Sequence, residues 1–139
     1  MEKKVFLNCT AHNLTAAQKE KAKERFQVDK FINLKEINPE LFNKLSSMKL
    51  EDDVEDLCYK LFEFINNYTH FYNIVYVHMP CGSPYFMAYF FYDFLNRVNF
   101  NGTVKFIFSF SERKVVEKNI NGKIEKKSIF QFIDYQILN

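Results

Sequence analysis

Residues 73–98, NIVYVHMPCGSPYFMAYFFYDFLNRV, decide the fold of this chain. The segment starts with an apolar, β-branched run and passes through a Pro-Cys-Gly-Ser turn into a second, longer apolar run. This pattern predicts a buried strand at 73–78, a tight turn, and a helix at 84–97, since Ser is a good N-cap and Pro suits the first helical position. Ligands of open parallel sheets bind where such strands end. The turn at 81–83 is therefore the first candidate site.

On either side of this unit, short β-rich runs alternate with segments of helical periodicity. Further strands are expected at 4–8, 30–34 and 103–110, and further helices at 15–26, after Asn38-Pro39, and from Asp52 or Asp53 to about Asn67. Thr15 and Gln18 fit a capping box at the start of the first helix, whose inward face is expected to include Ala17, Ala22 and Phe26. Alternation of strands and helices predicts a Rossmann-like, mostly parallel sheet with helices on both faces.

The end of the chain changes character. Two alternating runs, 113–120 and 123–133, are joined by Asn121-Gly122, a dipeptide that strongly predicts a β-hairpin. Between 112 and 127 the basic side chains outnumber the acidic ones by six to three. A solvated hairpin face and an anion-facing patch both explain this excess. The predicted fold class is α/β, with a C-terminal β-hairpin added to the sheet.

Length and composition set further limits. A chain of 139 residues is expected to form one domain, 1–139. Its 17 Phe and 8 Tyr exceed what one small core hides, which favours an interface between two copies or a ligand site. A net charge of +2 gives no global field for long nucleic acid. Three widely spaced cysteines, the absence of a signal-peptide pattern and the lack of an apolar run of about 20 residues predict a cytoplasmic protein that binds no membrane.

Polar residues follow three of the predicted strands, at the edge where a parallel sheet holds its ligand. The candidates are Asn8, Cys9, Thr10, His12 and Asn13 after the first strand, Cys81, Gly82 and Ser83, with Tyr85 nearby, after the central strand, and Ser109, Ser111, Arg113 and Lys114 after the fourth. Each group is a short polar set that ends an apolar run.

Several of these residues have two explanations from sequence. The turn at 81–83 fits a phosphate site at a helix N-terminus and equally an ordinary capped turn. It matches neither a P-loop nor GxGxxG, so nothing supports an ATPase or an NAD enzyme. His12 fits a general base or a hydrogen-bond donor to phosphate, and equally a loop residue. His70 and His78 are expected to be structural, with lining of the site as the alternative for His78 at the end of its strand. Cys81 fits a reactive thiol or a small packing residue, and Ser83 an N-cap more than a nucleophile.

The motifs VFLN…HNLTAAQ, PELFNKL, VHMPCGSPYFMAYF and FSFSERKVVEK-NGKIEKKSIFQF follow one another along nearly the whole chain. In this order they resemble the small single-domain CRISPR-associated proteins with a CARF-like (CRISPR-associated Rossmann) fold, of the ring-nuclease type. The chain departs from that family in having Ser83 followed by Pro84, and in a longer loop around Thr10.

This resemblance implies a homodimer that binds a cyclic oligoadenylate, expected to be cyclic tetra-adenylate, and cleaves it to linear di-adenylates. No metal or other cofactor is implied, and the products would end in 2′,3′-cyclic phosphates, which switches off type III CRISPR signalling. His12 is expected to move the proton, and Arg113 or Lys114 to stabilise charge. The other candidates listed by strand end above are expected to bind the ring.

Three alternatives remain open at the level of sequence. The first is a non-catalytic sponge or sensor for the same ring. The second is an unrelated Rossmann-like enzyme that uses Cys81 or Ser83 in acyl or redox chemistry. The third is a dimeric structural partner whose aromatic side chains form only an interface.

Overall fold

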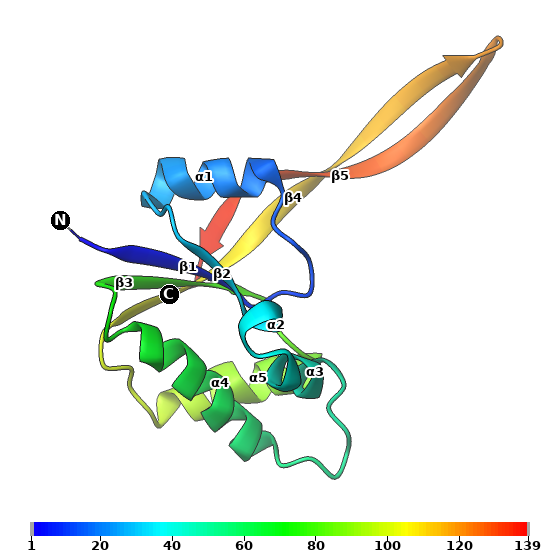
Figure 1. Cartoon of the computed structure of the whole chain (residues 1–139). Coiled ribbons are helices and arrows are strands. Elements are labelled where there is room, and N and C mark those ends of the chain that lie inside the picture. Colours follow the sequence, from blue (N-terminus) through cyan, green and yellow to red (C-terminus); the bar gives the residue numbers. More distant parts are fainter. Residues whose placement is uncertain (1, 139) are drawn as a thin grey trace.

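The computed structural model describes residues 2–138 as a five-stranded sheet with helices on both faces (Figure 1). The strands are β1 Lys4–Asn8, β2 Phe31–Asn33, β3 Ile74–Met79, β4 Thr103–Ile120 and β5 Lys123–Ile137, in the sheet order β2-β1-β3-β4-β5. The helices are α1 Ala16–Phe26, α2 Leu34–Ile37, α3 Pro39–Ser46, α4 Val54–Tyr68 and α5 Pro84–Tyr92, followed by the 3₁₀ turn η1 Phe94–Asn96. The first four strands are parallel and β5 is antiparallel to β4, so the predicted fold class is confirmed.

The strand order places a switch point between β1 and β3. From β1 the chain proceeds to β2 on one side, and from β3 it proceeds to β4 on the other. The two central strands pair in parallel, with Asn8 opposite His78 at their carboxyl ends. Ligands of open α/β sheets bind beyond such a point, because the loops on the two sides diverge there.

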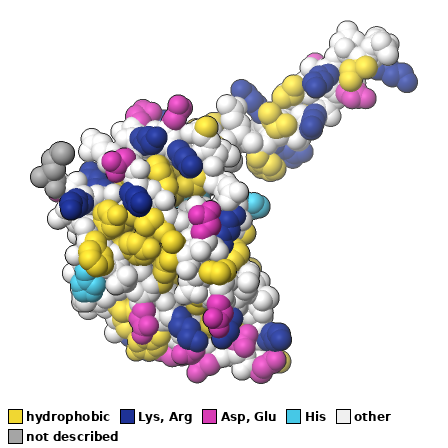
Figure 2. Space-filling model, viewed as in Figure 1, with side chains coloured by type: hydrophobic (Ala, Val, Ile, Leu, Met, Phe, Trp, Pro, Cys, Tyr) yellow, Lys and Arg dark blue, Asp and Glu magenta, His cyan; other side chains and the backbone are white. Residues whose placement is uncertain are grey.

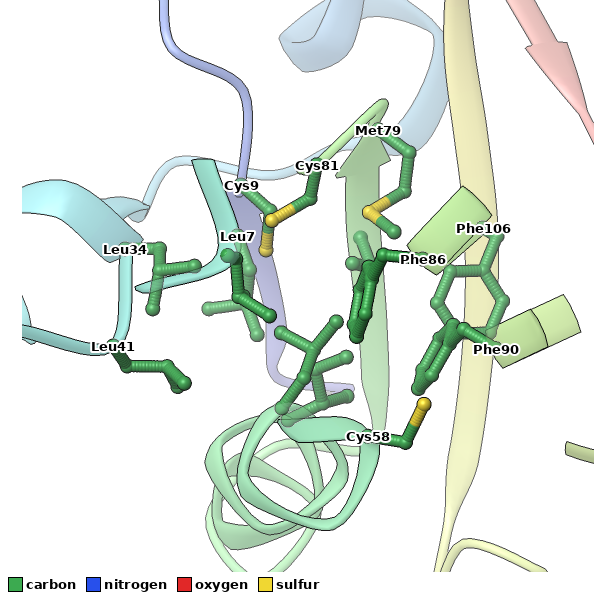
Figure 3. Close-up of a cluster of buried hydrophobic side chains, with 14 of the residues drawn as sticks. Leu7, Cys9, Leu34, Leu41, Cys58, Met79, Cys81, Phe86, Phe90 and Phe106 are labelled. Carbon is green, nitrogen blue, oxygen red and sulfur yellow. The ribbon is translucent and has the colours of Figure 1, made fainter. Parts of the chain in front are cut away.

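Two apolar layers hold the sheet between helices. On one face α1 packs Phe26 against Tyr76, with ring centroids 4.5 Å apart. On the other face α3, α4 and α5 cover a larger core, which contains Phe86 and Phe90 (Figure 3). The ring of Phe90 stacks between those of Phe86 and Phe94, with centroids 5.8 Å from each. Together the two layers bury eight of the 25 Phe and Tyr side chains, and the others are partly or fully exposed.

In the described part of the chain, local capping signals predicted four of the five α-helix starts correctly, and missed only α2, which has no side-chain cap. Thr15, Asn38, Asp53 and Ser83 each cap the helix that follows through a side-chain oxygen. The capping box of Thr15 is complete, although Ala17 is exposed rather than inward. Within residues 2–138 no helix combines the length and the apolar character that crossing a bilayer requires.

The predicted end of the last helix was wrong. α5 stops at Tyr92 instead of continuing to residue 97, and the chain tightens into η1. Phe94 is fully buried against Phe90, and Arg97 reaches back to Asp93 and Glu55, both at 2.8 Å. These tertiary contacts are stronger than the local helix propensity of the segment.

β4 also differs from its prediction, since it continues to Ile120 instead of ending at residue 110. The pairing shifts register between Phe110 and Ser111, and beyond that point β4 and β5 form a two-stranded ribbon. We call residues 111–131 the arm; all of them are exposed, and the arm projects from the body (Figure 1). The predicted turn is confirmed, with left-handed φ angles of 52° at Asn121 and 81° at Gly122.

Candidate functional site

A cavity of about 430 Å³ opens at the carboxyl edge of the sheet, where β1 and β3 end and β4 continues past Ser109 into the arm. It is lined by Thr10, Ala11, His12, Gln18, Phe42, Ser46, His78, Met79, Pro80, Gly82, Phe108 and Ser109. Four of these are predicted site residues, namely Thr10, His12, Gly82 and Ser109. The structure therefore brings together one or more candidates from each of the three strand ends, beside the switch point.

Asn8 is the fully buried centre of the polar groups behind this cavity. Its Nδ2 donates to the His12 carbonyl and to Asn33 Oδ1, both at 2.9 Å. Its Oδ1 accepts from the Thr10 backbone amide at 3.3 Å and the Thr10 hydroxyl at 2.7 Å, and lies 3.0 Å from His78 Nδ1. A carbonyl only accepts and a backbone amide only donates, so the main chain fixes the orientation of this side-chain amide.

The orientation of Asn8 determines the protonation of His78. Because Asn8 Oδ1 is an acceptor, His78 Nδ1 must carry the proton. Burial lowers the pKa of His78 to about 4, so the imidazole is neutral at pH 7 and its Nε2 is an acceptor. The hydroxyl of Ser109, 2.7 Å away, therefore donates to that nitrogen.

Gln18 fixes the other side of Ser109. Its Oε1 accepts from the Thr15 backbone amide at 2.8 Å in the capping box, so its Nε2 is the group that donates to Ser109 Oγ at 3.1 Å. The backbone carbonyl of Gln18 accepts a hydrogen bond from the Tyr135 hydroxyl at 2.7 Å, which links α1 to β5. We call Asn8, His78 and Ser109 the relay, since one hydrogen-bonded chain links them from the core to the cavity.

The turn at 81–83 is shaped by packing. Gly82 has φ +77°, and a Cβ at this position would lie 2.8 Å from the Leu45 carbonyl oxygen. The Cys81 amide donates to Met87 Sδ at 3.4 Å, and Ser83 caps the Phe86 amide at 3.2 Å. Of the three residues only Gly82 lines the cavity. Cys81 and Ser83 make the contacts expected of an ordinary capped turn.

The thiols of Cys9 and Cys81 lie in the core and do not line the cavity (Figure 3). Burial raises the pKa of Cys81 to about 12 and that of Cys9 well above its ordinary value. A thiolate is therefore strongly disfavoured at either position, which removes the physical basis for thiol chemistry at Cys81. Asn13 and Tyr85 are exposed and also lie outside the cavity lining.

Ser111, Arg113 and Lys114 belong to the arm and do not line the cavity of their own chain. Arg113 Nε donates to Ser128 Oγ across the ribbon at 3.1 Å. Lys and Arg side chains are spread along the arm (Figure 2). The expectation that these cations follow directly on Ser109 at one site fails because β4 continues outward as a strand.

Sequence reasoning missed the roles of His78 and Gln18. His78 was assigned a structural role, and Gln18 only its part in a cap. The available signal was a histidine at the end of the central strand, but its partners lie 70 and 31 residues away in sequence. Only the strand register places Asn8 beside it.

A larger cavity of about 550 Å³ lies between α3 and α4. Its charged lining residues are Glu40, Lys44, Lys60 and Glu63. The two acids and two bases balance, and none of the predicted site residues lies there. The cavity at the strand ends is therefore the better candidate site.

No curated protein and no solved structure matches this chain. One family model matches residues 4–136, a span that begins with β1 and ends one residue before the end of β5. The matched span includes the cavity, the relay and the arm, so that on the evidence of this match the chain belongs to the Uncharacterized protein MJ1673 family.

Proposed function

We propose that this protein binds a cyclic oligoadenylate, expected to be cyclic tetra-adenylate, as a cytoplasmic homodimer and cleaves it to linear di-adenylates. Such cleavage would switch off type III CRISPR signalling. The proposal starts from the CARF-like sequence resemblance. The observation that supports it most strongly is the cavity at the switch point, where polar groups from β1, β3, β4 and the loops after β1 and β3 converge.

The lining of the cavity suits part of a nucleotide. Phe42 and Phe108, both half-buried, supply apolar surface for a base, while Thr10 and Gln18 supply hydrogen-bonding groups. A volume of about 430 Å³ accommodates one nucleotide unit rather than a whole ring. A two-fold dimer would offer two such cavities, which matches the repeat of a ring with four nucleotides.

Ring opening requires a ribose 2′-hydroxyl to attack the adjacent phosphorus. The O2′–P bond forms and the P–O5′ bond breaks, which leaves a 2′,3′-cyclic phosphate and a 5′-hydroxyl. The protein must align these atoms and move one proton. His12 lines the cavity and remains the residue proposed to move the proton or to position the reacting groups. Arg113 and Lys114 would stabilise charge only if the arm of a second protomer carries them to the cavity.

Incubation of the protein with cyclic tetra-adenylate and EDTA tests the activity. Chromatography with mass detection is expected to show linear di-adenylates with 2′,3′-cyclic phosphate ends. His12→Ala is expected to lower turnover about 100-fold or more. His70→Ala, at an exposed histidine in the turn after α4, is the matched control. An intact ring after long incubation with stoichiometric protein would disprove the cleavage.

A sponge or sensor for the same ring is the second candidate. The observation that favours it is that no Asp or Glu is among the described residues that line the cavity, so neither His12 nor His78 has a carboxylate partner there with which to form an acid–base pair. Calorimetry that finds tight binding, with the ring recovered intact, would select this function. Binding followed by cleavage would exclude it.

A further inference from the structure

We infer that the relay is catalytic. Ser109 Oγ accepts a hydrogen bond, and then the proton, from a hydroxyl group of the ligand, and the Ser109 hydroxyl passes its own proton to His78. The assignment of the ribose 2′-hydroxyl as that group rests on the proposed function. The activation of Ser109 does not, because it follows from contacts within this chain.

The positions of the protons carry the inference. Backbone groups fix both side-chain amides: the Thr10 amide and the His12 carbonyl fix Asn8, and the Thr15 amide fixes Gln18. Each hydrogen bond of Ser109 then has a defined donor: the Ser109 hydroxyl donates to His78 Nε2 at 2.7 Å, and Gln18 Nε2 donates to Ser109 Oγ. The neighbours of the Ser109 hydroxyl therefore determine its orientation.

Ser109 has one acceptor position left. A serine oxygen carries one hydrogen and two acceptor sites. The hydrogen goes to His78, and Gln18 occupies one acceptor site at 3.1 Å. Ser109 is partly exposed and lines the cavity. The remaining acceptor site is thus available to a donor in the cavity, and a hydroxyl group is a suitable donor.

The arrangement has the three parts of an activated hydroxyl: an oxygen, a base within hydrogen-bond reach, and a group that orients the base. Asn8 holds the imidazole in the Nδ1–H tautomer, and acts through His78 as a positioning residue. The rings of Phe6 and Tyr135 lie against the imidazole, with centroids 5.5 and 5.6 Å away. They restrict its movement and keep water from it.

The chemical step balances within the site. The ligand hydroxyl donates to Ser109 Oγ, and as its oxygen bonds to phosphorus its proton moves to Oγ while the Ser109 proton moves to His78 Nε2. The P–O5′ bond breaks, and the leaving oxygen recovers the proton along the same path or from His12. Asn8 Oδ1 remains bonded to Nδ1–H throughout and stabilises the transient imidazolium.

Diisopropyl fluorophosphate tests the activation of Ser109 without any ring ligand. Ser109 Oγ would bond to phosphorus, the P–F bond would break, and His78 would take the proton. Peptide mass mapping is expected to find the adduct at Ser109, formed about tenfold or more faster than at any other serine. Ser109→Ala should lose this adduct. Ser47→Ala, where the hydroxyl instead donates to the Asn43 carbonyl, should retain it.

Kinetics with cyclic tetra-adenylate test the ribose assignment. Ser109→Ala is expected to lower kcat about 100-fold while KM stays within about threefold. The pH profile should lose activity near pH 4 instead of near 6.5, because the groups that face His78 are Asn8, Ser109, Phe6 and the uncharged Tyr135.

The outcomes separate the two proposals. If the wild type cleaves the ring and Ser109→Ala cleaves it equally fast, the relay is wrong and the proposed function stands. If Ser109 forms the adduct but the ring stays intact, the activated serine stands and the proposed function fails. If folded protein forms no adduct at Ser109, the relay is wrong whatever happens to the ring.

Discussion

His78 shows how burial changes the chemistry of one side chain. β3 carries it into the interior, where it is 3% exposed and lies between Phe6 and Tyr135. Desolvation disfavours the charged imidazolium there, and lowers the pKa to about 4. The same residue in the unfolded chain titrates near 6.5.

This difference predicts how stability depends on pH. Below pH 6.5 His78 is protonated in the unfolded chain but stays neutral in the folded protein until the pH approaches 4. Proton binding therefore favours the unfolded chain, and the stabilisation present above pH 6.5 is lost as the pH falls towards 4. The full loss amounts to roughly 3 kcal/mol for a shift of this size. Urea unfolding at pH 7 and pH 4 is expected to show a larger drop for the wild type than for His78→Gln, which cannot titrate. Equal drops would contradict the assigned cause.

At the scale of elements, two turns with similar backbone angles differ in what surrounds them. Gly82, between β3 and α5, has φ +77° and faces the Leu45 carbonyl oxygen, 2.8 Å from where a Cβ would be. Gly122, between β4 and β5, has φ +81° with nothing within 4 Å. The first glycine is required by its angle and by packing, and the second by its angle alone.

Alanine substitutions at the two glycines separate these effects. Gly82→Ala is expected to lower the free energy of unfolding by about 2–3 kcal/mol, because the main chain must also move away from α3. Gly122→Ala is expected to cost only about 1 kcal/mol, from backbone strain. Urea titration of both variants measures the difference. Equal losses would show that the contact with Leu45 contributes nothing.

The boundaries of the elements were unequally predictable. Helix starts such as Thr15 and Ser83 follow from a capping side chain within three residues of the amide it binds. The end of α5 depends instead on Phe94 entering the core and on Arg97 reaching Glu55, 42 residues away. Contacts between residues so far apart in sequence cannot be predicted from a local sequence pattern.

At the scale of the whole molecule, the arm has two different faces. Paired residues of an antiparallel ribbon lie on one face, so Arg113–Phe130, Val115–Ser128 and Asn119–Ile124 share the first face. Its apolar side chains Phe130, Val115 and Ile124 are 78%, 59% and 66% exposed. The second face carries Lys114, Lys118, Lys123 and Lys127, and its apolar side chains Val116, Ile120 and Ile129 are less exposed, at 37%, 48% and 39%.

The proposed homodimer gives the first face of the arm a partner. An isolated two-stranded ribbon is only marginally stable in water, and apolar side chains this exposed commonly mark an interface. The double variant Phe130→Ser, Ile124→Ser is expected to weaken the dimer about tenfold or more by sedimentation analysis. Lys118→Ser, Lys123→Ser on the second face is the control and should leave the dimer intact. A wild type that sediments as a monomer would refute the prediction.

The sequence by itself determined the order along the chain of the strands and of the helices α1, α3, α4 and α5, whereas the four-residue helix α2 was not predicted. Capping residues, the Asn121-Gly122 turn and the apolar run at 73–98 act over a few residues, so they specified the helix starts, the hairpin and the central strand. They also specified the edge of the sheet at which a site belongs, because strand–helix alternation implies parallel strands with loops at a common edge.

Only the tertiary structure decided which side chains meet at that edge. Asn8, Gln18, His78 and Ser109 come from four separate segments. The register of β1, β3 and β4 brings Asn8, His78 and Ser109 into one hydrogen-bonded chain, and the packing of α1 on the sheet adds Gln18. The same pairing directs the thiols of Cys9 and Cys81 into the core and carries Arg113 outward along the arm. Register is set by hydrogen bonds and packing between distant residues, whereas a local sequence pattern reports only on its neighbours.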